Sequence, residues 1–156
     1  MKTTIFAALA ALIPVGAMAH DGVGVSDAYA RSANPVTGAA FMVLSNHRDV
    51  DCSLVGVASD VAERVELHTT REVDGVMKMI RIEEPIEIAP YASHALQRGG
   101  DHVMFMGVKQ PLKDGDMIPL TLDFGDCGTE TVEVPVDNQR MPQPAGGTGE
   151  GAMQGH

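Results

Sequence analysis

The sequence predicts an all-β domain, a Greek-key sandwich or barrel, on three observations. Short segments of alternating apolar and polar residues recur along the chain, and clusters of Gly, Pro, Asp and Asn separate them. No segment beyond the N-terminal region repeats its apolar residues with a convincing helical period. The chain has 156 residues, which is the length of one domain.

The predicted strands follow one another in chain order, and each ends at a turn signal. The Asp74-Gly75 pair between two apolar segments is the strongest short hairpin signal in the chain. Residues 91–100 are expected to form a loop, and residues 60–63 are compatible with a single helical turn. We expect strands at residues 22–33, 38–47, 52–59, 62–70, 86–90, 101–106, 117–124 and 130–136, and residues 71–82 carry the hairpin turn at Asp74-Gly75.

Residues 1–19 have the layout of a secretory signal peptide. Lys2 precedes an apolar stretch that is too short to span a bilayer, and an Ala-x-Ala cleavage site follows at residues 17–19. We therefore expect a periplasmic mature chain that starts at His20, without stable insertion into a membrane. Because no cysteine lies near the cut, a lipid anchor is not expected.

Composition divides the mature chain into two parts. Residues 20–137 carry the predicted strands and form the expected domain. Residues 138–156 are rich in Pro, Gly and Gln, cannot bury a core, and are expected to be a flexible tail that contains Met and His.

The charge balance of the chain is strongly acidic. Removal of residues 1–19 takes away one of 11 basic residues and none of the 21 acidic ones, so the mature net charge is −11. This balance argues against nucleic-acid binding, which needs Lys and Arg to neutralise phosphates. It suits the attraction of cations or of a basic partner, and we expect a monomer.

The only two cysteines of the chain are Cys52 and Cys127. In an oxidising compartment a disulfide between them is the natural expectation, and two unpaired buried thiols are the alternative. The chain has no Cys-x-x-Cys pair, as a thiol oxidoreductase would need, and Cys127 lacks the nearby downstream His of a blue-copper site. No Ser or Cys stands in a recognisable nucleophile setting, so an enzyme is not expected.

Residues 99–107, GGDHVMFMG, place imidazole and thioether groups on one face of a predicted strand. Because side chains alternate between the faces of a strand, His102 and Met104 are expected to point outward. Val103 and Phe105 then point to the core. Such a division leaves donor atoms, rather than the usual polar residues, on the outer face.

Two further donors stand in the same kind of setting. His68 ends a predicted strand on the face opposite its apolar residues, and Met79 shares a face with Met77 in the following strand. If these strands are neighbours, His68 and Met79 converge with His102 and Met104. Two imidazoles and two thioethers form a soft, neutral donor set that favours Cu(I) over Zn(II), Ca(II) or Mg(II). The alternative is that the methionines only fill a core.

Over residues 25–136 the chain resembles the periplasmic copper chaperone family PCuAC. It carries DAYAR, AAFMVLSN, LVGVASDVAERVELH, DGVMKMIRI, GGDHVMFMGV and TLDFGDCGTETVEVPV in the order of the family. The copper motif of the family is a His, a Met after ten intervening residues, and a distant His-x-Met. His68, Met79 and residues 102–104 match this motif, whereas residues 98–100 are Arg-Gly-Gly in place of the usual Pro-Gly-Gly.

The resemblance implies a cupredoxin-like Greek-key β-sandwich that holds Cu(I) near its surface with His68, Met79, His102 and Met104. It also implies a metallochaperone that passes copper by ligand exchange to a cuproprotein or a second chaperone, toward the Cu(A) centre of cytochrome c oxidase. The alternatives are an exported β-sandwich interaction domain and a copper-storage or scavenging protein without a delivery role.

Further sulfur and nitrogen donors of the chain are candidate copper ligands. Met77 and Met106 are each either packing beside the site or an alternate copper ligand. A second, weaker site for Cu(II) at the chain ends is one hypothesis, because the α-amine and imidazole of His20 can chelate one ion and nitrogen donors suit Cu(II). The alternative is an inert, solvated tail and an incidental histidine. The donors of the tail are Met141, Met153 and His156.

Overall fold

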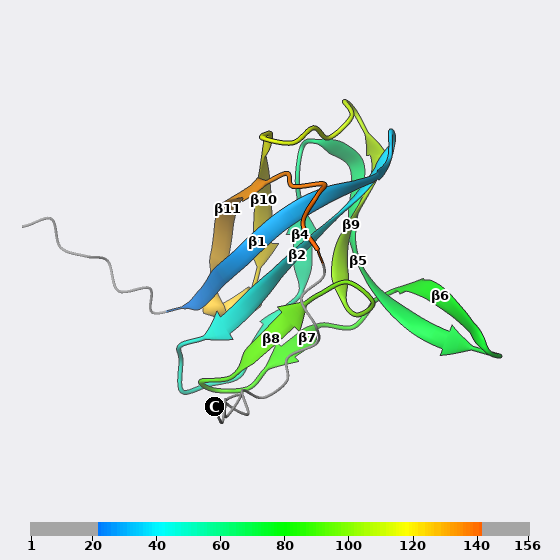
Figure 1. Ribbon diagram of the computed structural model, residues 1–156. Helices are drawn as coiled ribbons and strands as arrows, with labels where there is room; N and C mark the ends of the chain where they lie inside the picture. Colours follow the sequence, from blue (N-terminus) through cyan, green and yellow to red (C-terminus); the bar gives the residue numbers. More distant parts are fainter. Residues whose placement is uncertain (1–21, 142–156) are drawn as a thin grey trace, which may run out of the picture.

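The computed structural model describes residues 22–141, and these residues form a β-sandwich (Figure 1). Antiparallel strands make up nearly all of its regular structure, and the one helical element among the described residues is a short 3-10 turn. The prediction of an all-β domain is therefore confirmed. The strands are β1 (Val23–Asn34), β2 (Thr37–Asn46), β3 (Cys52–Leu54), β4 (Gly56–Ala58), β5 (Ala62–Val73), β6 (Val76–Arg81), β7 (Ile86–Ile88), β8 (Ser93–Leu96), β9 (His102–Val108), β10 (Met117–Asp123) and β11 (Thr129–Pro135), and the 3-10 turn is η1 (Gly125–Cys127).

Two sheets form the sandwich. The larger sheet has the order β1-β2-β9-β5-β6, and β8 also pairs with β2. The smaller sheet has the order β11-β10-β4, and β3 and β7 form a separate pair. Strand β9 lies between β2 and β5 although it follows both in the sequence, so long connections of the Greek-key kind are present.

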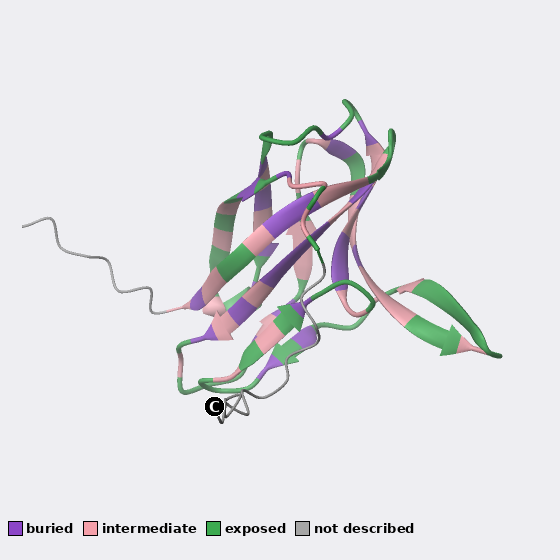
Figure 2. Cartoon of the chain, viewed as in Figure 1, coloured by how far each residue is buried: buried purple, intermediate pink, exposed green. Residues whose placement is uncertain are grey.

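The core lies between the two sheets, where every second side chain of the central strands is buried (Figure 2). On β9 the core side chains are Val103 and Phe105, both fully buried, as the alternation predicted. Leu120 and Leu122 of β10 are equally buried in the same core cluster. Burial of this kind contributes roughly 25 cal/mol per Å² of apolar surface, which holds the two sheets together.

The β5–β6 hairpin extends away from the sandwich (Figure 1). Its turn is the predicted Asp74-Gly75 pair, with φ of 53° and 79°, between the paired residues Val73 and Val76. Two positive φ angles in a two-residue turn match the twist of the flanking strands, which explains why this dipeptide favours a hairpin. Figure 2 shows that the outer part of the hairpin is exposed, so nothing in the described chain packs over it.

Three sequence-based expectations about elements were wrong. The strand expected at residues 52–59 is two strands, because the amide of Val55 donates to the Asp123 carbonyl and the chain changes sheets there. Residues 60 and 61 form a turn and not a helical one, and β5 begins at Ala62. The loop expected at residues 91–100 contains β8, which pairs with β2 over four residues. No local sequence pattern predicts this pairing.

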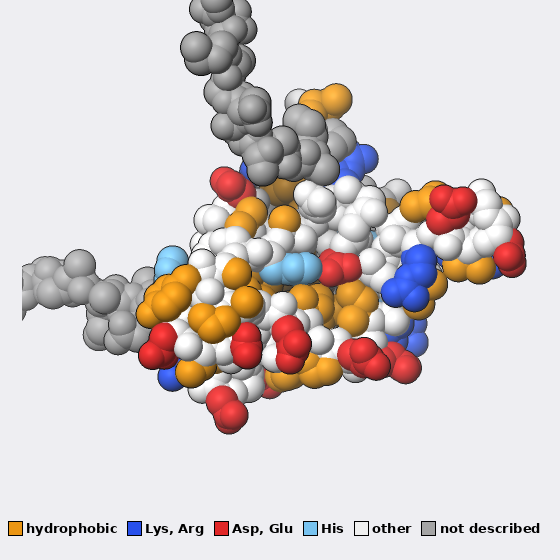
Figure 3. Space-filling model, turned by 90° about the horizontal axis from the view of Figure 1, so that it is seen from below, with side chains coloured by type: hydrophobic (Ala, Val, Ile, Leu, Met, Phe, Trp, Pro, Cys, Tyr) orange, Lys and Arg blue, Asp and Glu red, His pale blue; other side chains and the backbone are white. Residues whose placement is uncertain are grey.

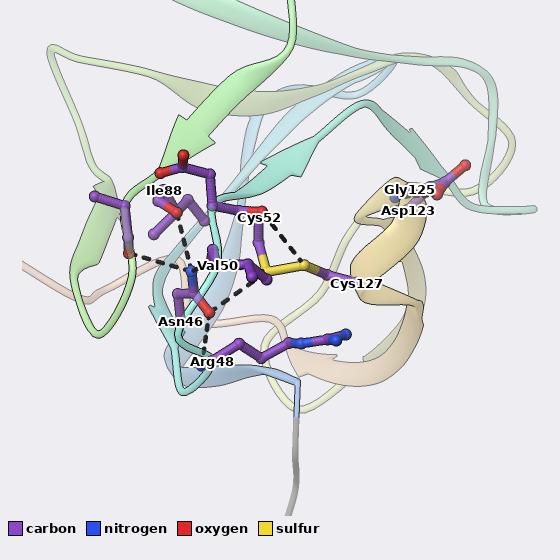
Figure 4. The surroundings of a disulfide bond; sticks show 10 residues. Asn46, Arg48, Val50, Cys52, Ile88, Asp123, Gly125 and Cys127 are labelled. Atoms are coloured by element: carbon purple, nitrogen blue, oxygen red, sulfur yellow. Dashed lines mark hydrogen bonds between the residues drawn. A yellow bond between two sulfur atoms is a disulfide. The ribbon is translucent and has the colours of Figure 1, made fainter.

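The disulfide between Cys52 and Cys127 is present, as predicted (Figure 4). It joins β3 to η1 across the end of the sandwich. Beside it the buried Asn46 donates its amide to the carbonyls of Val50, Ile88 and Ala89. The side-chain oxygen of Asn46 accepts from the amide of Arg48, so the polar group under this disulfide is fully hydrogen-bonded.

The signal peptide expected at residues 1–19 lies outside the described residues, as do His20 and most of the predicted tail. Within residues 22–141 no helix has the length and apolarity needed to span a bilayer.

Candidate metal site

The outer face of the larger sheet carries all four predicted ligands. Residues that pair directly across antiparallel strands point to the same side. His68 of β5 pairs with His102 of β9, and Met104 follows two residues later on that face of β9. On the other side of β5, Met79 of β6 pairs with Thr70, two residues after His68. The register therefore puts the two imidazoles at the centre and one thioether on each side of them.

His102 has one occupied and one free ring nitrogen. Its Nδ1 lies 2.9 Å from the carbonyl oxygen of Gly100, and a carbonyl can only accept, so Nδ1 carries the hydrogen. The lone pair is then on Nε2, which is buried and has no hydrogen-bond partner among the described residues. An unpartnered buried nitrogen is costly unless something else binds it.

His68 repeats this arrangement with the opposite nitrogens. Its Nε2 lies 3.0 Å from Oε2 of Glu66, and its Nδ1 is buried with no partner within residues 22–141. The ring centroids of His68 and His102 are 6.2 Å apart, inclined at 50°. A ring nitrogen that donates to a carboxylate or a carbonyl while the other nitrogen stays free is the usual arrangement of a metal-binding histidine.

Burial and the hydrogen bonds set the charges at this pair. Burial lowers the pKa of His102, against the opposing effect of the Gly100 carbonyl, so its imidazole stays neutral into mildly acidic solution. The hydrogen bond from His68 is the main cause that lowers the pKa of Glu66, and Arg81, 3.9 Å away, adds to it. The first effect keeps the imidazole of His102 neutral, and the second keeps the carboxylate of Glu66 ionised. A neutral imidazole and an ionised carboxylate that orients it both suit metal binding.

The two methionines differ in exposure. Met79 has 61% of its surface exposed, on the projecting hairpin, whereas Met104 is half-buried in the sheet. Met79 and His102 line a small pocket of about 120 Å³, together with Phe41, Arg98 and other residues. This pocket gives a ligand access to His102 from the side of Met79.

His102 lies on the predicted face of β9, but it is not open to solvent. The residue is only 3% exposed. The ring of Phe41 lies 6.1 Å from the His102 ring, and Arg98 and Gly99 line the pocket beside it. Alternation along a strand predicts which face a side chain takes, but neighbouring strands and loops decide whether that face is covered.

The alternate donors are placed differently from the four predicted ligands. Met106 accepts a hydrogen bond at its sulfur from Arg64, at 3.3 Å, so that lone pair is occupied. Met77 is 59% exposed and lies farther out on β6, opposite Glu72. Met141 is 77% exposed at the end of the described chain. His20, Met153 and His156 lie outside the described residues.

Sequence reasoning missed the groups that hold the imidazoles. Glu66 has a signal in the sequence, since it stands two residues before His68 and alternation places both on one face. The Gly100 carbonyl has none, because a backbone contact within a loop leaves no pattern. Between residues 22 and 141 no three His, Cys, Asp or Glu side chains gather closely enough to hold a metal ion.

Residues 23–136 match the model of the LpqE-like family, which is described as "Putative lipoprotein LpqE-like". The putative lipoprotein Lxx21020 of Leifsonia xyli subsp. xyli is 36% identical over 116 residues, which cover 74% of this chain and 70% of that protein. The uncharacterized protein RP573 of Rickettsia prowazekii is 31% identical over 100 residues, 64% of this chain and 55% of that one.

Solved structures share the fold. The Cu(I) form of DR1885 from Deinococcus radiodurans is 34% identical, with a TM-score of 0.58, and covers 80% of this chain and 84% of that one. The apo form of DR1885 is also 34% identical, with a TM-score of 0.56 and coverages of 87% and 93%. The copper-bound PCuAC domain from PmoF2 is 20% identical, with a TM-score of 0.61 and coverages of 74% and 92%. These likenesses confirm the predicted cupredoxin-like fold.

Proposed function

Since this chain belongs to the LpqE-like family of PCuAC copper-chaperone domains, we propose that it binds one Cu(I) ion and passes it to another copper protein. The proposed ligands are the Nδ1 of His68, the Nε2 of His102 and the sulfurs of Met79 and Met104. The observation that carries this proposal is the pair of facing imidazoles, each with a buried nitrogen that no described residue satisfies. The similar protein DR1885 has been solved in a Cu(I) form, which supports the same oxidation state here.

The donor chemistry supports cargo binding and not permanent storage. Two neutral imidazoles and two thioethers bind Cu(I) without a thiolate, so a stronger donor set on a partner can take the ion. Cys52 and Cys127, the only cysteines, are joined to each other and supply no thiolate. The proposed destination is the Cu(A) centre of cytochrome c oxidase, reached directly or through a second chaperone.

The exposures suggest the order in which ligands exchange. Met79 is the accessible ligand, and His102 is 3% exposed. An incoming donor therefore approaches through the pocket and replaces Met79 first, while the two imidazoles and Met104 still hold the ion. Copper then moves by association of a new ligand before loss of an old one, and is never free in solution.

Two finer expectations complete the proposal. We propose that the chain is exported through cleavage of residues 1–19 and works in the periplasm, where no nucleic acid is a partner.

The second Cu(II) site at the chain ends stays a prediction from the sequence. It is tested by comparing Cu(II) spectra of the chain from His20, the same chain with one residue added before His20, and a chain ending at Val136.

The test of the main proposal is competition with a Cu(I) chelator under reducing, oxygen-free conditions. The Met79→Leu variant is expected to bind Cu(I) more weakly than the parent chain. Met117→Leu is the matched control, because Met117 is also an exposed methionine, at 54%, but lies on β10 of the other sheet. Equal affinities of all three proteins would show that Met79 is not a ligand. A loaded protein that keeps its copper against every acceptor domain would favour storage.

A further inference from the structure

The outer face of the larger sheet concentrates arginine in an otherwise acidic chain. The whole chain has a formal net charge of −10 and seven arginines. Five of the seven lie on the face that carries the candidate copper site, which we call the copper face. These five are Arg31, Arg64, Arg81, Arg98 and Arg140.

Strand register fixes three of these positions. Arg81 pairs directly with His68 across β6 and β5. Arg64 pairs with Met106 across β5 and β9. Arg31 of β1 pairs with a residue of β2 that in turn pairs with Met104 of β9. Because paired residues share a face, all three arginines surround the copper ligands.

Contacts fix the other two positions. Arg98 lines the pocket that also contains Met79 and His102. The guanidinium of Arg140 lies over the ring of Tyr29, 4.3 Å from its centroid. The Tyr29 ring in turn lies against Phe41, at 5.2 Å between centroids, and Phe41 lies beside His102. Arginine side chains therefore border the site from β1 across to β6.

Little negative charge balances these arginines. The carboxylates nearest the site are Glu66 and Glu72 on the face itself and Asp101 beside His102, and Asp101 lies 2.9 Å from His94. Within the described part of the chain only Arg81 lies within 4.0 Å of a carboxylate, and Glu66 is also engaged by His68. Elsewhere acidic side chains predominate, as on the surface seen from below in Figure 3. The copper face is thus positive in a protein that is negative overall.

Exposed methionine lies at the edge of the same face. Met77 and Met79 of β6 are 59% and 61% exposed. Methionine and arginine are both enriched in protein–protein interfaces, whereas lysine and glutamate are depleted there. Arginine is also among the residues that dominate binding energy in such interfaces. The composition of the copper face is that of a docking surface with an apolar edge and a positive border.

We propose that the copper face docks a negatively charged protein surface, namely the acidic rim around the copper ligands of a partner. The proposal rests on the proposed function, since docking there brings the donors of the partner to Met79. Charge complementarity selects the orientation, because an acidic partner is repelled by the remaining acidic surface and attracted only by this face. An acidic chaperone thereby meets an acidic acceptor with the two copper sites facing each other.

The test uses two synthetic peptides that share a Met-Gly-His core. One peptide has glutamates on both sides of the core, and the other has glutamines. Binding to the copper-free protein is measured by fluorescence anisotropy at low and at moderate salt, so docking is tested even if copper transfer fails. We expect the glutamate peptide to bind at least about tenfold more tightly at low salt and to lose this advantage as salt screens the charges.

Variants locate the surface. The double variant Arg64→Glu, Arg98→Glu is expected to remove the preference for the glutamate peptide. The matched control is Lys109→Glu, Lys113→Glu, which changes the net charge equally at two exposed lysines between β9 and β10. Circular dichroism and thermal unfolding establish that both double variants are folded. Copper transfer to the same peptides is then measured separately with the loaded protein.

Several outcomes would overturn the docking proposal. They are equal binding of both peptides, equal losses in the two double variants, or binding only to phosphatidylglycerol vesicles. Concentration-dependent self-association that Arg64→Glu, Arg98→Glu abolishes would make a second copy of the chain the occupant and would also overturn it. Normal peptide docking without any copper transfer would instead count against the proposed delivery function and leave the docking surface intact.

Discussion

The two imidazoles and the exposed methionine of the candidate site come from regions with opposite properties. His68 and His102 pair across adjacent strands inside the larger sheet, and a hydrogen bond to Glu66 or Gly100 orients each ring. Met79 lies on an edge strand of a hairpin that extends into solvent and is 61% exposed. The difference in exposure indicates different roles for the two regions in holding and releasing a metal ion. In the proposed ligand set, the centre of the sheet supplies fixed donors, and the edge supplies a donor that can leave.

The largest effect is expected from removal of an imidazole. The His102→Ala variant should lower Cu(I) affinity by more than about 100-fold, because it deletes a proposed ligand rather than a residue that orients one. The measurement is chelator competition with the reduced, copper-loaded protein. Far-UV circular dichroism controls for folding, since the substitution also leaves a small buried cavity. An affinity within a few-fold of the parent would place the copper elsewhere.

The second effect tests whether the imidazole pair is held in place by its neighbours. Glu66→Gln keeps the size of the side chain but replaces the charged acceptor of the His68 hydrogen bond with a neutral one. Loss of such an outer partner typically costs about 10- to 100-fold in metal affinity. Glu72→Gln is the control, because Glu72 lies on the same strand and face without a hydrogen bond to either histidine. If the two variants bind Cu(I) equally well, the orienting role of Glu66 is wrong.

A smaller equilibrium effect is expected at the edge of the sheet. Met79→Leu should weaken Cu(I) binding by about tenfold or less, since two imidazoles and Met104 remain and thioethers are the weaker donors. Its effect on the rate of transfer to an acceptor should be more marked, because Met79 is the accessible ligand. Stopped-flow transfer measurements compare it with Met104→Leu. Equal changes in rate for the two variants would contradict the proposed order of exchange.

The smallest expected effect is a loss of folding stability of the copper-free protein at acidic pH. Because the pKa of His102 is lowered in the folded state, the unfolded chain takes up a proton on this group first as the pH falls. The contribution of His102 to stability is therefore complete above the ordinary imidazole pKa of about 6.5 and is lost as the pH falls through the lower folded-state value. Urea unfolding at several pH values should show this decline in the parent chain. A His102→Gln variant should decline less, and an equal decline in both would assign the effect to another group.

Much of the fold could be predicted from local patterns. The Asp74-Gly75 turn needs two positive φ angles that few other dipeptides adopt, so its position was predictable and is confirmed. The alternation in residues 102–106 indicated the correct core face of β9. Strand β8 was missed because its four residues gain order only by pairing with β2, and the break at Val55 was missed because it depends on a hydrogen bond to distant Asp123.

The residue types and their spacing by themselves predicted the kind of chemistry, and they determined the face on which the donor groups lie. Imidazole and sulfur alternate with core residues in β9, and this periodicity requires no knowledge of the partner strands. Only the tertiary structure decided that His102 is buried beside Phe41, that Glu66 and Gly100 leave one nitrogen of each ring free, and that five arginines surround the pair. Burial, orientation and local charge arise from segments far apart in the sequence. They are therefore set by how the strands are assembled, and no single strand encodes them.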